Sequence, residues 1–323
     1  MLIMHRRVYL LCIALLSTLV LASACEPSFH QTTVEPAKTA TAPVSTPSPS
    51  PTATAIPSPT PTPVAPAHYT SQIILQGVGR PDDLAFDQNG RMLFSDEING
   101  TISRINVDGS VTVLLHDVAG PEGMVVLPDG TILFAEQKTN RIVSLAPGAT
   151  IPRVLRTLPG TPSTATCKDG VDGIAFDPTT RTLIVPDSPI GNVYRLSLDG
   201  KTLTLLASGI TRPVGATVDK QGTIYIADEC GGAIWTISPA GKTTRIGGFS
   251  MPDDVLLDGS GNLLVIDLEP SIHALIRYNL ATGKREVLAQ QGFIEPQGLA
   301  LDPQSNIYVS DDYANLIIKF RPA

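Results

Sequence analysis

The chain has 323 residues and a formal net charge of −7, with 30 acidic and 23 basic side chains. This balance excludes the strongly basic proteins that hold nucleic acid by its phosphates, because phosphate binding needs clustered positive charge. The chain after residue 68 is long enough to bury a single large hydrophobic core.

The first 25 residues have the pattern of a secretory signal. A basic stretch at residues 5–7 precedes an apolar run at 8–21, and small residues then lead to Cys25. This end resembles the bacterial lipoprotein signal, in which the Cys is lipidated, although Ala22 stands where that family usually has Leu. We therefore expect an extracytoplasmic protein, lipid-anchored to a bacterial membrane at Cys25. The alternatives are cleavage after Ala24, which gives a secreted protein, and a retained membrane helix.

Residues 26–68 are predicted to form a disordered stalk. From Gln31 to Ala67 the sequence is mostly Pro, Thr, Ser, Ala and Val, with ten prolines and no charged residue after Lys38. Such a segment cannot build a core, and dense proline favours extended polyproline II. It would hold a folded body, residues 69–323, away from the membrane. Simple disorder that provides distance alone is the alternative.

One short phrase recurs six times in the predicted body. Its first copy is Pro81-Asp82-Asp83, and a closing acid follows at Asp96. From phrase start to closing acid the interval is 15 residues in five copies and 16 in the third. The phrases begin at residues 81, 121, 171, 213, 252 and 296, so successive starts lie 39 to 50 residues apart. This period is typical of radial or stacked repeats.

Each repeat contains four short runs of β-branched, aliphatic and aromatic residues, separated by turn-forming pairs such as Asp-Gly and Asn-Gly. In the first repeat the predicted strands are 84–86, 92–95, 102–106 and 111–115. No stretch has the apolar periodicity of a helix. The body is therefore predicted to be all-β, a six-bladed β-propeller.

The two ends of the repeat region predict how the ring closes. The sixth repeat stops after its third strand, 316–320, whereas residues 71–76 form a spare strand before the first repeat. Pairing the spare strand as the outermost strand of the last blade, with Ile74 near Ile318, removes two exposed edges. A β-sandwich of the same strands would not explain why one strand is missing at one end and spare at the other.

Two repeats carry a resemblance to known families. The residues from Pro296 to Ile317 resemble the NHL repeat, with Pro-x-Gly, three apolar residues and Asp, followed by Asn-Ile-Tyr-Val-x-Asp. The third repeat, 172–195, is similar to the gluconolactonase and senescence-marker-protein family. Both families are six-bladed propellers, and the resemblance implies that fold for the whole body. It implies less about activity, because these repeats serve hydrolases, lyases and binding modules.

Cys167 and Cys230 are the two cysteines of the predicted body. Cys167 lies in the insertion before the third blade, and Cys230 lies in the turn after the second strand of the fourth. In a propeller these positions share one face of neighbouring blades, so we predict a disulfide between them. A reactive or metal-binding pair is the alternative, but no His or third Cys accompanies them.

Acidic side chains are predicted to gather at one mouth of the central channel. In an antiparallel blade the start of the first strand and the end of the second strand lie at the same end, and more than half of the 30 acids occupy those positions. Arg80, Lys138, Lys168 and Arg212 oppose them. Such a concentration creates a negative field over the mouth. The acids placed there are Asp82, Asp83, Asp96, Glu97, Glu122, Glu136, Asp169, Asp172, Asp187, Asp228, Glu229, Asp253, Asp254, Asp267, Glu269, Glu295, Asp311 and Asp312.

Comparison of the six repeats separates acids that every blade needs for its structure from acids that occur in some blades only. The closing acid occurs in all six copies, and we interpret it as a residue that bonds turn amides. The middle position of the phrase varies and points toward the channel. Several carboxylates there would repel one another unless a cation sat among them. We therefore predict a divalent metal, Ca²⁺ first, held by some of Asp82, Glu122, Asp172 and Asp253. A solvated acidic rim without metal is the alternative.

The gluconolactonase resemblance also implies a metal at this place, held by a Glu before the first blade, an Asn in the third and an Asp in the next. Carried over by position, these become Arg80, Asp172 and Val214, of which only Asp172 could bind a metal. Asp253 and Glu122 could hold a relocated ion. That ion would act as a Lewis acid on a lactone or ester carbonyl, with an adjacent carboxylate as general base.

Few other residues carry a chemical signal. His273 is the one His that the blade order places at the acidic mouth, and it is a candidate proton carrier, with a solvated loop His as the alternative. Tyr313 lies in a loop at the same face, whereas the other aromatic residues fall on strands.

Two functions of different class follow. The first is a membrane-anchored propeller that binds a small molecule, a glycan or a protein at its acidic face. The second is a metal-dependent hydrolase, lactonase-like or esterase-like, or a lyase. The loss of two of the three family ligand positions favours binding.

Overall fold

The computed structural model describes residues 69–77, 79–268, 271, 273–290 and 292–322. The predicted signal, the lipidation site at Cys25 and the predicted stalk lie outside the described residues. In the described part of the chain, no helix is both long and apolar enough to cross a bilayer.

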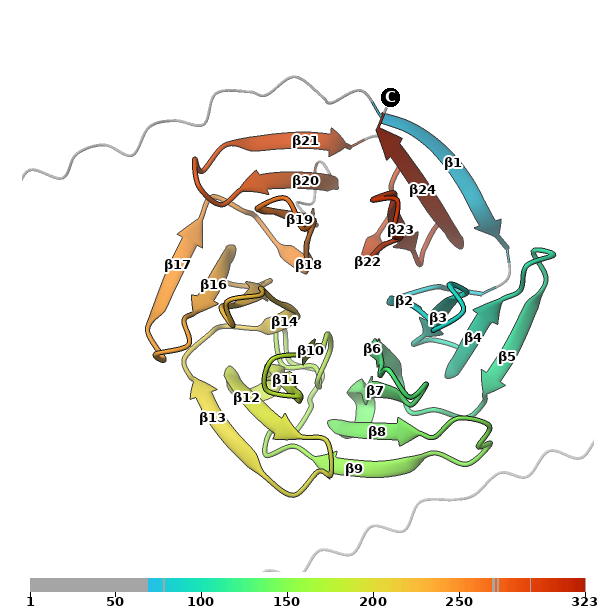
Figure 1. Ribbon diagram of the computed structural model, residues 1–323. Coiled ribbons are helices and arrows are strands. Elements are labelled where there is room, and N and C mark those ends of the chain that lie inside the picture. The colour runs from blue at the N-terminus through green and yellow to red at the C-terminus, as the bar shows by residue number, and fades with distance from the viewer. Residues whose placement is uncertain (1–68, 78, 269–270, 272, 291, 323) are drawn as a thin grey trace, which may run out of the picture. The chain divides into compact units, whose positions relative to one another are not determined.

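The described residues form six four-stranded antiparallel sheets arranged radially around a central axis (Figure 1). The prediction of an all-β, six-bladed propeller is confirmed. We number the blades in chain order. Blade 1 contains β2 (Leu84–Phe86), β3 (Met92–Asp96), β4 (Thr101–Ile105) and β5 (Val111–Leu115). Blade 2 contains β6 (Pro121–Val126), β7 (Ile132–Glu136), β8 (Arg141–Leu145) and β9 (Arg153–Thr157).

The next three blades repeat this plan. Blade 3 contains β10 (Ala175–Asp177), β11 (Thr182–Asp187), β12 (Asn192–Ser197) and β13 (Leu203–Ala207). Blade 4 contains β14 (Pro213–Val218), β15 (Ile224–Asp228), β16 (Ala233–Ile237) and β17 (Thr243–Gly247). Blade 5 contains β18 (Pro252–Leu257), β19 (Asn262–Asp267), β20 (Ala274–Asn279) and β21 (Arg285–Ala289). Single 3-10 turns follow β7 and β11, at Gln137–Thr139 and Ser188–Ile190.

Blade 6 closes the ring with the two ends of the described chain. It contains β22 (Pro296–Leu301), β23 (Ile307–Asp311), β24 (Leu316–Pro322) and, on its outer edge, β1 (Tyr69–Gln76). Ile73 pairs with Ile318, and a register irregularity follows at Ile74. The predicted closure is therefore confirmed, with the register displaced by one residue (Figure 1).

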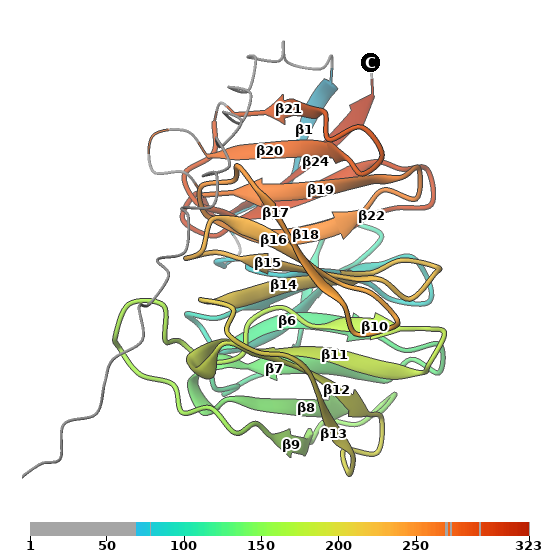
Figure 2. The ribbon, with the colours of Figure 1, turned by 90° about the vertical axis from the view of Figure 1, so that its left-hand side faces the viewer.

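The second strand of each blade forms the core. Strands such as β3, β7, β15 and β23 are buried along their whole length, because each packs against neighbouring blades on both faces. Seen from the side, the strands run roughly along the axis, and the green loop between β9 and β10 extends beyond the blades at one face (Figure 2).

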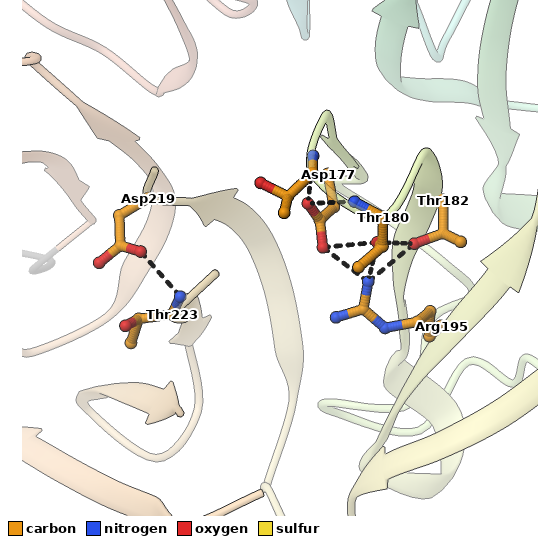
Figure 3. A network of polar contacts seen from close by, with 7 residues as sticks. Asp177, Thr180, Thr182, Arg195, Asp219 and Thr223 are labelled. Atoms are coloured by element: carbon orange, nitrogen blue, oxygen red, sulfur yellow. Dashed lines mark hydrogen bonds and ion pairs between the residues drawn. The ribbon is translucent and has the colours of Figure 1, made fainter. Parts of the chain in front are cut away.

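The turns at the opposite face from the acidic mouth are held by aspartates. Asp177 accepts hydrogen bonds from the backbone N–H groups of Thr179 and Thr180, and it pairs with Arg195 at 2.6 Å (Figure 3). Asp219 likewise accepts from the Thr223 N–H. Asp87, Asp258 and Asp302 repeat the arrangement in their own blades. These acids build the scaffold and leave the other face for function.

Candidate functional site

The closing acids hold the turns around the mouth. Asp96 accepts a hydrogen bond from the Arg80 N–H at 2.8 Å, and Asp228 accepts one from the Arg212 N–H at 3.0 Å. Asp187, Asp267 and Asp311 bond backbone N–H groups in the same way. Glu136 differs, because it pairs with the Arg141 side chain. This interpretation of the closing acids as structural residues is confirmed in five of the six blades.

A cavity of about 290 Å³ lies inside this ring of turns, and we call it the acidic chamber. Its described lining includes nine carboxyl side chains and two arginines. The carboxyl groups belong to Asp82, Glu97, Glu122, Asp169, Asp172, Glu229, Asp253, Glu295 and Asp312. The arginines are Arg80 and Arg212, and Gln137, Gln297, Ile98, Leu268 and Tyr313 complete the lining.

All four residues predicted to hold a metal line this chamber. Glu122 and Asp253 are buried, whereas Asp82 and Asp172 are partly exposed to it. Carboxyl oxygens are the donors that hard cations prefer, so the chemistry of the set fits Ca²⁺. In the described part of the chain, however, no three His, Cys, Asp or Glu side chains are close enough together to form a metal site. Metal binding by these residues stays a prediction.

Asp82 and Glu122 form a carboxyl pair. Their side chains are hydrogen-bonded to each other, which requires a proton on one of them. Burial raises the pKa of Asp82 to about 8, with further repulsion from Asp172. Burial and the neighbouring Asp82 charge raise the pKa of Glu122 well above its usual range. Two carboxyl groups that share a proton cannot both ionise easily, so the pair holds a proton at neutral pH.

Arg212 neutralises the side of the chamber formed by blades 3 and 4. Its guanidinium lies 3.2 Å from Asp172 and 3.5 Å from Asp169, and it also pairs with Glu229. Val214, the middle residue of the blade 4 phrase, is fully buried in the hydrophobic core. Blade 4 therefore contributes Arg212, two positions earlier, and Glu229, which follows β15.

A disulfide supports this cluster. Cys167 and Cys230 are bonded to each other, with their Cα atoms 6.2 Å apart. Cys167 lies two residues before Asp169, and Cys230 directly follows Glu229. The bond therefore joins the two loops that supply carboxylates to Arg212.

Arg80 occupies the equivalent position in blade 1, directly before the phrase. Its guanidinium pairs with Asp312 at 2.6 Å and lies 4.0 Å from the centre of the Tyr313 ring. Tyr313 is 57% exposed, so much of its ring is open to a ligand. The expectation that Tyr313 lies in a loop at this face is confirmed.

The Asp253 side chain makes no hydrogen bond or ion pair with any described residue. It is only 8% exposed. Burial and the nearby Asp172 charge raise the pKa of the Asp253 carboxyl well above its usual range, and the Arg212 charge only partly opposes this rise. Because this carboxyl lines the cavity and has no protein donor, it is a candidate ligand-binding group.

Below the chamber the channel narrows to a neck, a space of about 20 Å³ that could hold a single water molecule. Asp83 accepts a hydrogen bond from the Met124 N–H of the next blade, and Asp254 accepts one from Leu299 in the same way. Gly215 stands at the equivalent position in blade 4, where an added Cβ would lie 2.6 Å from the Asp253 carbonyl oxygen. The sequence placed both aspartates at the mouth but gave no sign that they bridge the blades.

His273, the candidate proton carrier, is half-buried, but it does not belong to the described lining of the chamber. The structure therefore does not bring it together with the carboxyl groups.

No protein-family model matches the chain. Its fold is similar to that of several solved propellers. A gluconolactonase from Xanthomonas campestris superimposes with a TM-score of 0.66 at 15% identity, over 82% of this chain and 99% of its own length. A streptogramin B lyase gives 0.61 at 13% identity, over 79% of this chain and 98% of the lyase. A chain of a nidogen–laminin complex superimposes with a TM-score of 0.61 at 20% identity, over 71% of this chain and 88% of its own length. These identities show a shared fold alone.

Proposed function

We propose that the acidic chamber is the active site of an enzyme, a hydrolase or lyase that acts on a small molecule through general acid–base catalysis. The observation that carries this proposal is the Asp82–Glu122 pair, two carboxyl groups hydrogen-bonded to each other in a partly enclosed cavity. Titratable groups perturbed by burial and by a specific neighbour are typical of functional sites. The names of two structural neighbours, a gluconolactonase and a lyase, also support an enzyme.

The pair can serve both halves of a lactone or ester hydrolysis. In the singly ionised form of the pair, reached as pH rises toward the Asp82 pKa of about 8, the Asp82 carboxylate would take a proton from water as the water oxygen attacks the carbonyl carbon. The protonated carboxyl, Glu122, would donate its proton to the alkoxide that leaves when the C–O bond breaks. The product is a hydroxy acid, or an acid and an alcohol, and the pair regains its original proton count. Such catalysis contributes about 10²- to 10⁴-fold in rate.

A divalent cation is the second candidate component of this site, and the excess of negative charge favours it. Asp82, Glu122 and Asp253 would hold the ion, since Asp172 is engaged by Arg212. When bound, it would polarise a carbonyl group and lower the pKa of a water molecule. Titration with Ca²⁺ in a calorimeter tests this component independently of activity. Heat and a rise in Tm at millimolar Ca²⁺ would support it. The absence of both signals would remove the ion from the proposal.

A screen of purified protein against lactones and aryl esters tests the enzyme. It would be run with chelator and with Ca²⁺, Mn²⁺ or Zn²⁺. We expect Glu122→Gln to lower kcat/KM at least about 100-fold, because the amide cannot donate the catalytic proton. Asp199→Asn, at an exposed position, is the matched control. Tight ligand binding without any turnover would instead favour the binding module, with a small molecule, glycan or protein as partner.

We also propose that this activity is displayed outside the cytoplasm on a lipid anchor at Cys25. Labelling of the chain with radioactive palmitate, and loss of the label in Cys25→Ser, would test the anchor. A soluble, unlabelled wild-type protein in the culture medium would favour secretion.

A further inference from the structure

The acidic chamber contains no free positive charge among its described lining residues. Both of its arginines are already paired, Arg212 with Asp172, Asp169 and Glu229, and Arg80 with Asp312. Nine carboxyl groups surround the space. An anionic ligand would be repelled, whereas a cation would be attracted, and low-dielectric walls strengthen both effects.

One carboxyl of the chamber combines deep burial with the lack of a protein partner. Asp253 comes from the start of β18 in blade 5, is more than nine-tenths buried, and has no hydrogen-bond or ion-pair partner among the described residues. It lines both the chamber and the neck. A carboxylate in this position lacks the donor that buried acids normally have. A ligand ammonium group would provide that donor.

Two exposed side chains with apolar surface stand in the mostly polar lining of the chamber. Ile98 in blade 1 is 52% exposed and Tyr313 in blade 6 is 57% exposed, and both line the cavity. Gln297, the middle residue of the blade 6 phrase, also belongs to the lining. A ligand that reaches from Asp253 across blade 6 would thus meet a carboxylate, an amide and then an apolar surface.

We propose that the chamber selects a small organic cation, a protonated amine that carries an aromatic or aliphatic group. The ammonium binds Asp253, and the apolar group lies against Ile98 and Tyr313. The size of the chamber, about 290 Å³, limits the ligand to a compact molecule. The proposal names a substrate class for the proposed enzyme, and rests on that function only in taking the chamber as the substrate site.

Three probes of one shape test the charge preference. Benzylamine, benzyl alcohol and benzoate would each be titrated against the purified full chain at pH 7. We expect benzylamine to bind at least about tenfold more tightly than benzyl alcohol, and benzoate to give no signal, because a charge-assisted hydrogen bond is worth at least a factor of ten. Equal binding of the three probes would overturn the proposal.

Two variants locate the site. Asp253→Asn should remove the tenfold preference, whereas Asp199→Asn, which changes an exposed acid, should keep it. Asp253→Asn removes an unpaired buried charge, so it is expected to fold. Tyr313→Ala should weaken the binding of benzylamine and leave the binding of methylamine unchanged. A benzylamine preference that survives in Asp253→Asn would overturn the assignment.

Two further results separate this inference from the enzyme proposal. Amine binding at Asp253 without turnover of any lactone or ester would remove the enzyme and leave the cation site. Turnover of uncharged esters that Asp253→Asn does not alter, together with no amine preference, would remove the cation site and leave the enzyme. Binding of Ca²⁺ by the wild type in place of any amine would also overturn the cation site.

Discussion

The carboxyl groups on the two sides of the acidic chamber have different partners. In blades 3 and 4, three carboxylates surround the Arg212 guanidinium, and a disulfide joins the loops that carry two of them. In blades 5, 6 and 1, Arg80 pairs with Asp312, but Asp253 has no hydrogen-bond or ion-pair partner among the described residues. Arg212 thus engages three carboxylates on one side, whereas the other side keeps a carboxyl that can receive a cation.

This difference shows how a repeat protein can separate stability from function within one ring of equivalent positions. Arg80 and Arg212 both precede the phrase, and each has its N–H bonded to a closing acid. Their side chains nevertheless do different things, because Arg212 is buried among carboxylates whereas Arg80 stacks on an exposed ring. The shared backbone fixes where a side chain starts, and its neighbours decide what it does.

The largest effect is expected from removing the disulfide on the closed side. The double substitution Cys167→Ser, Cys230→Ser should lower the free energy of unfolding by about 4 kcal/mol, because the bond closes a loop of 63 residues in the unfolded chain. Urea denaturation of the variant and of the wild type under oxidising conditions measures this. Addition of a reductant should lower the free energy of unfolding of the wild type by the same amount and leave that of the variant unchanged. A loss below about 1 kcal/mol would mean that the loops are held by other contacts.

Arg212→Met should lower the free energy of unfolding by about 3 kcal/mol, because three carboxylates lose their common cation while the apolar stem is kept. Arg321→Met, at an exposed position on β24, is the control and should change stability by less than about 0.5 kcal/mol. Thermal and urea unfolding at pH 7 give the comparison. The same variant should bind Ca²⁺ or benzylamine more tightly, since the closed side then resembles the open one. A stable variant without new cation affinity would contradict the contrast between the two sides.

The fold was predictable from sequence because every blade repeats the same physical requirements. The strands predicted for blade 1 agree with β2 to β5 within one residue at each end. The predicted closure was also found. A missing strand at one end and a spare strand at the other leave one pairing that removes both exposed edges. Ile74 was placed one residue out of register, because an irregularity in the pairing cannot be read from an alternating pattern.

The site was predictable as a location and less so as a set of contacts. Asp82, Glu122, Asp172 and Asp253 do meet in one cavity, as the position of the phrase requires. The sequence could not show which of them would be paired, because Arg212 and Asp253 reach the chamber from different blades and their partners depend on side-chain direction. The buried position of Val214 could not be read either, since a middle residue was expected to face the channel.

The open side should give the protein a characteristic pH dependence. The pKa values of Asp82, Glu122 and Asp253 are raised by burial and mutual repulsion, so the unfolded chain ionises these groups at lower pH than the folded one. Stability is therefore fully present below the ordinary carboxyl pKa, about 4, and is lost as pH rises toward the folded pKa, about 8 for Asp82. Asp253→Asn should flatten this fall and stabilise the protein by about 1 kcal/mol at pH 8. Tm measured from pH 4 to pH 9 tests both statements, with Asp199→Asn as the unchanged control.

The smallest effect is expected at the rim. Tyr313→Leu should lower the free energy of unfolding by about 0.5 kcal/mol, because the ring lies over Arg80 at a partly exposed position where a cation–π contact is weak. Tyr313→Phe keeps the aromatic face and should match the wild type. The two variants, compared by urea denaturation, separate the ring from its hydroxyl group. A loss of 2 kcal/mol or more, well above the range of about 0.5 to 1 kcal/mol for such contacts, would place Tyr313 among the structural residues of the ring. A small loss leaves it free to contact a ligand, as the open side of the chamber requires.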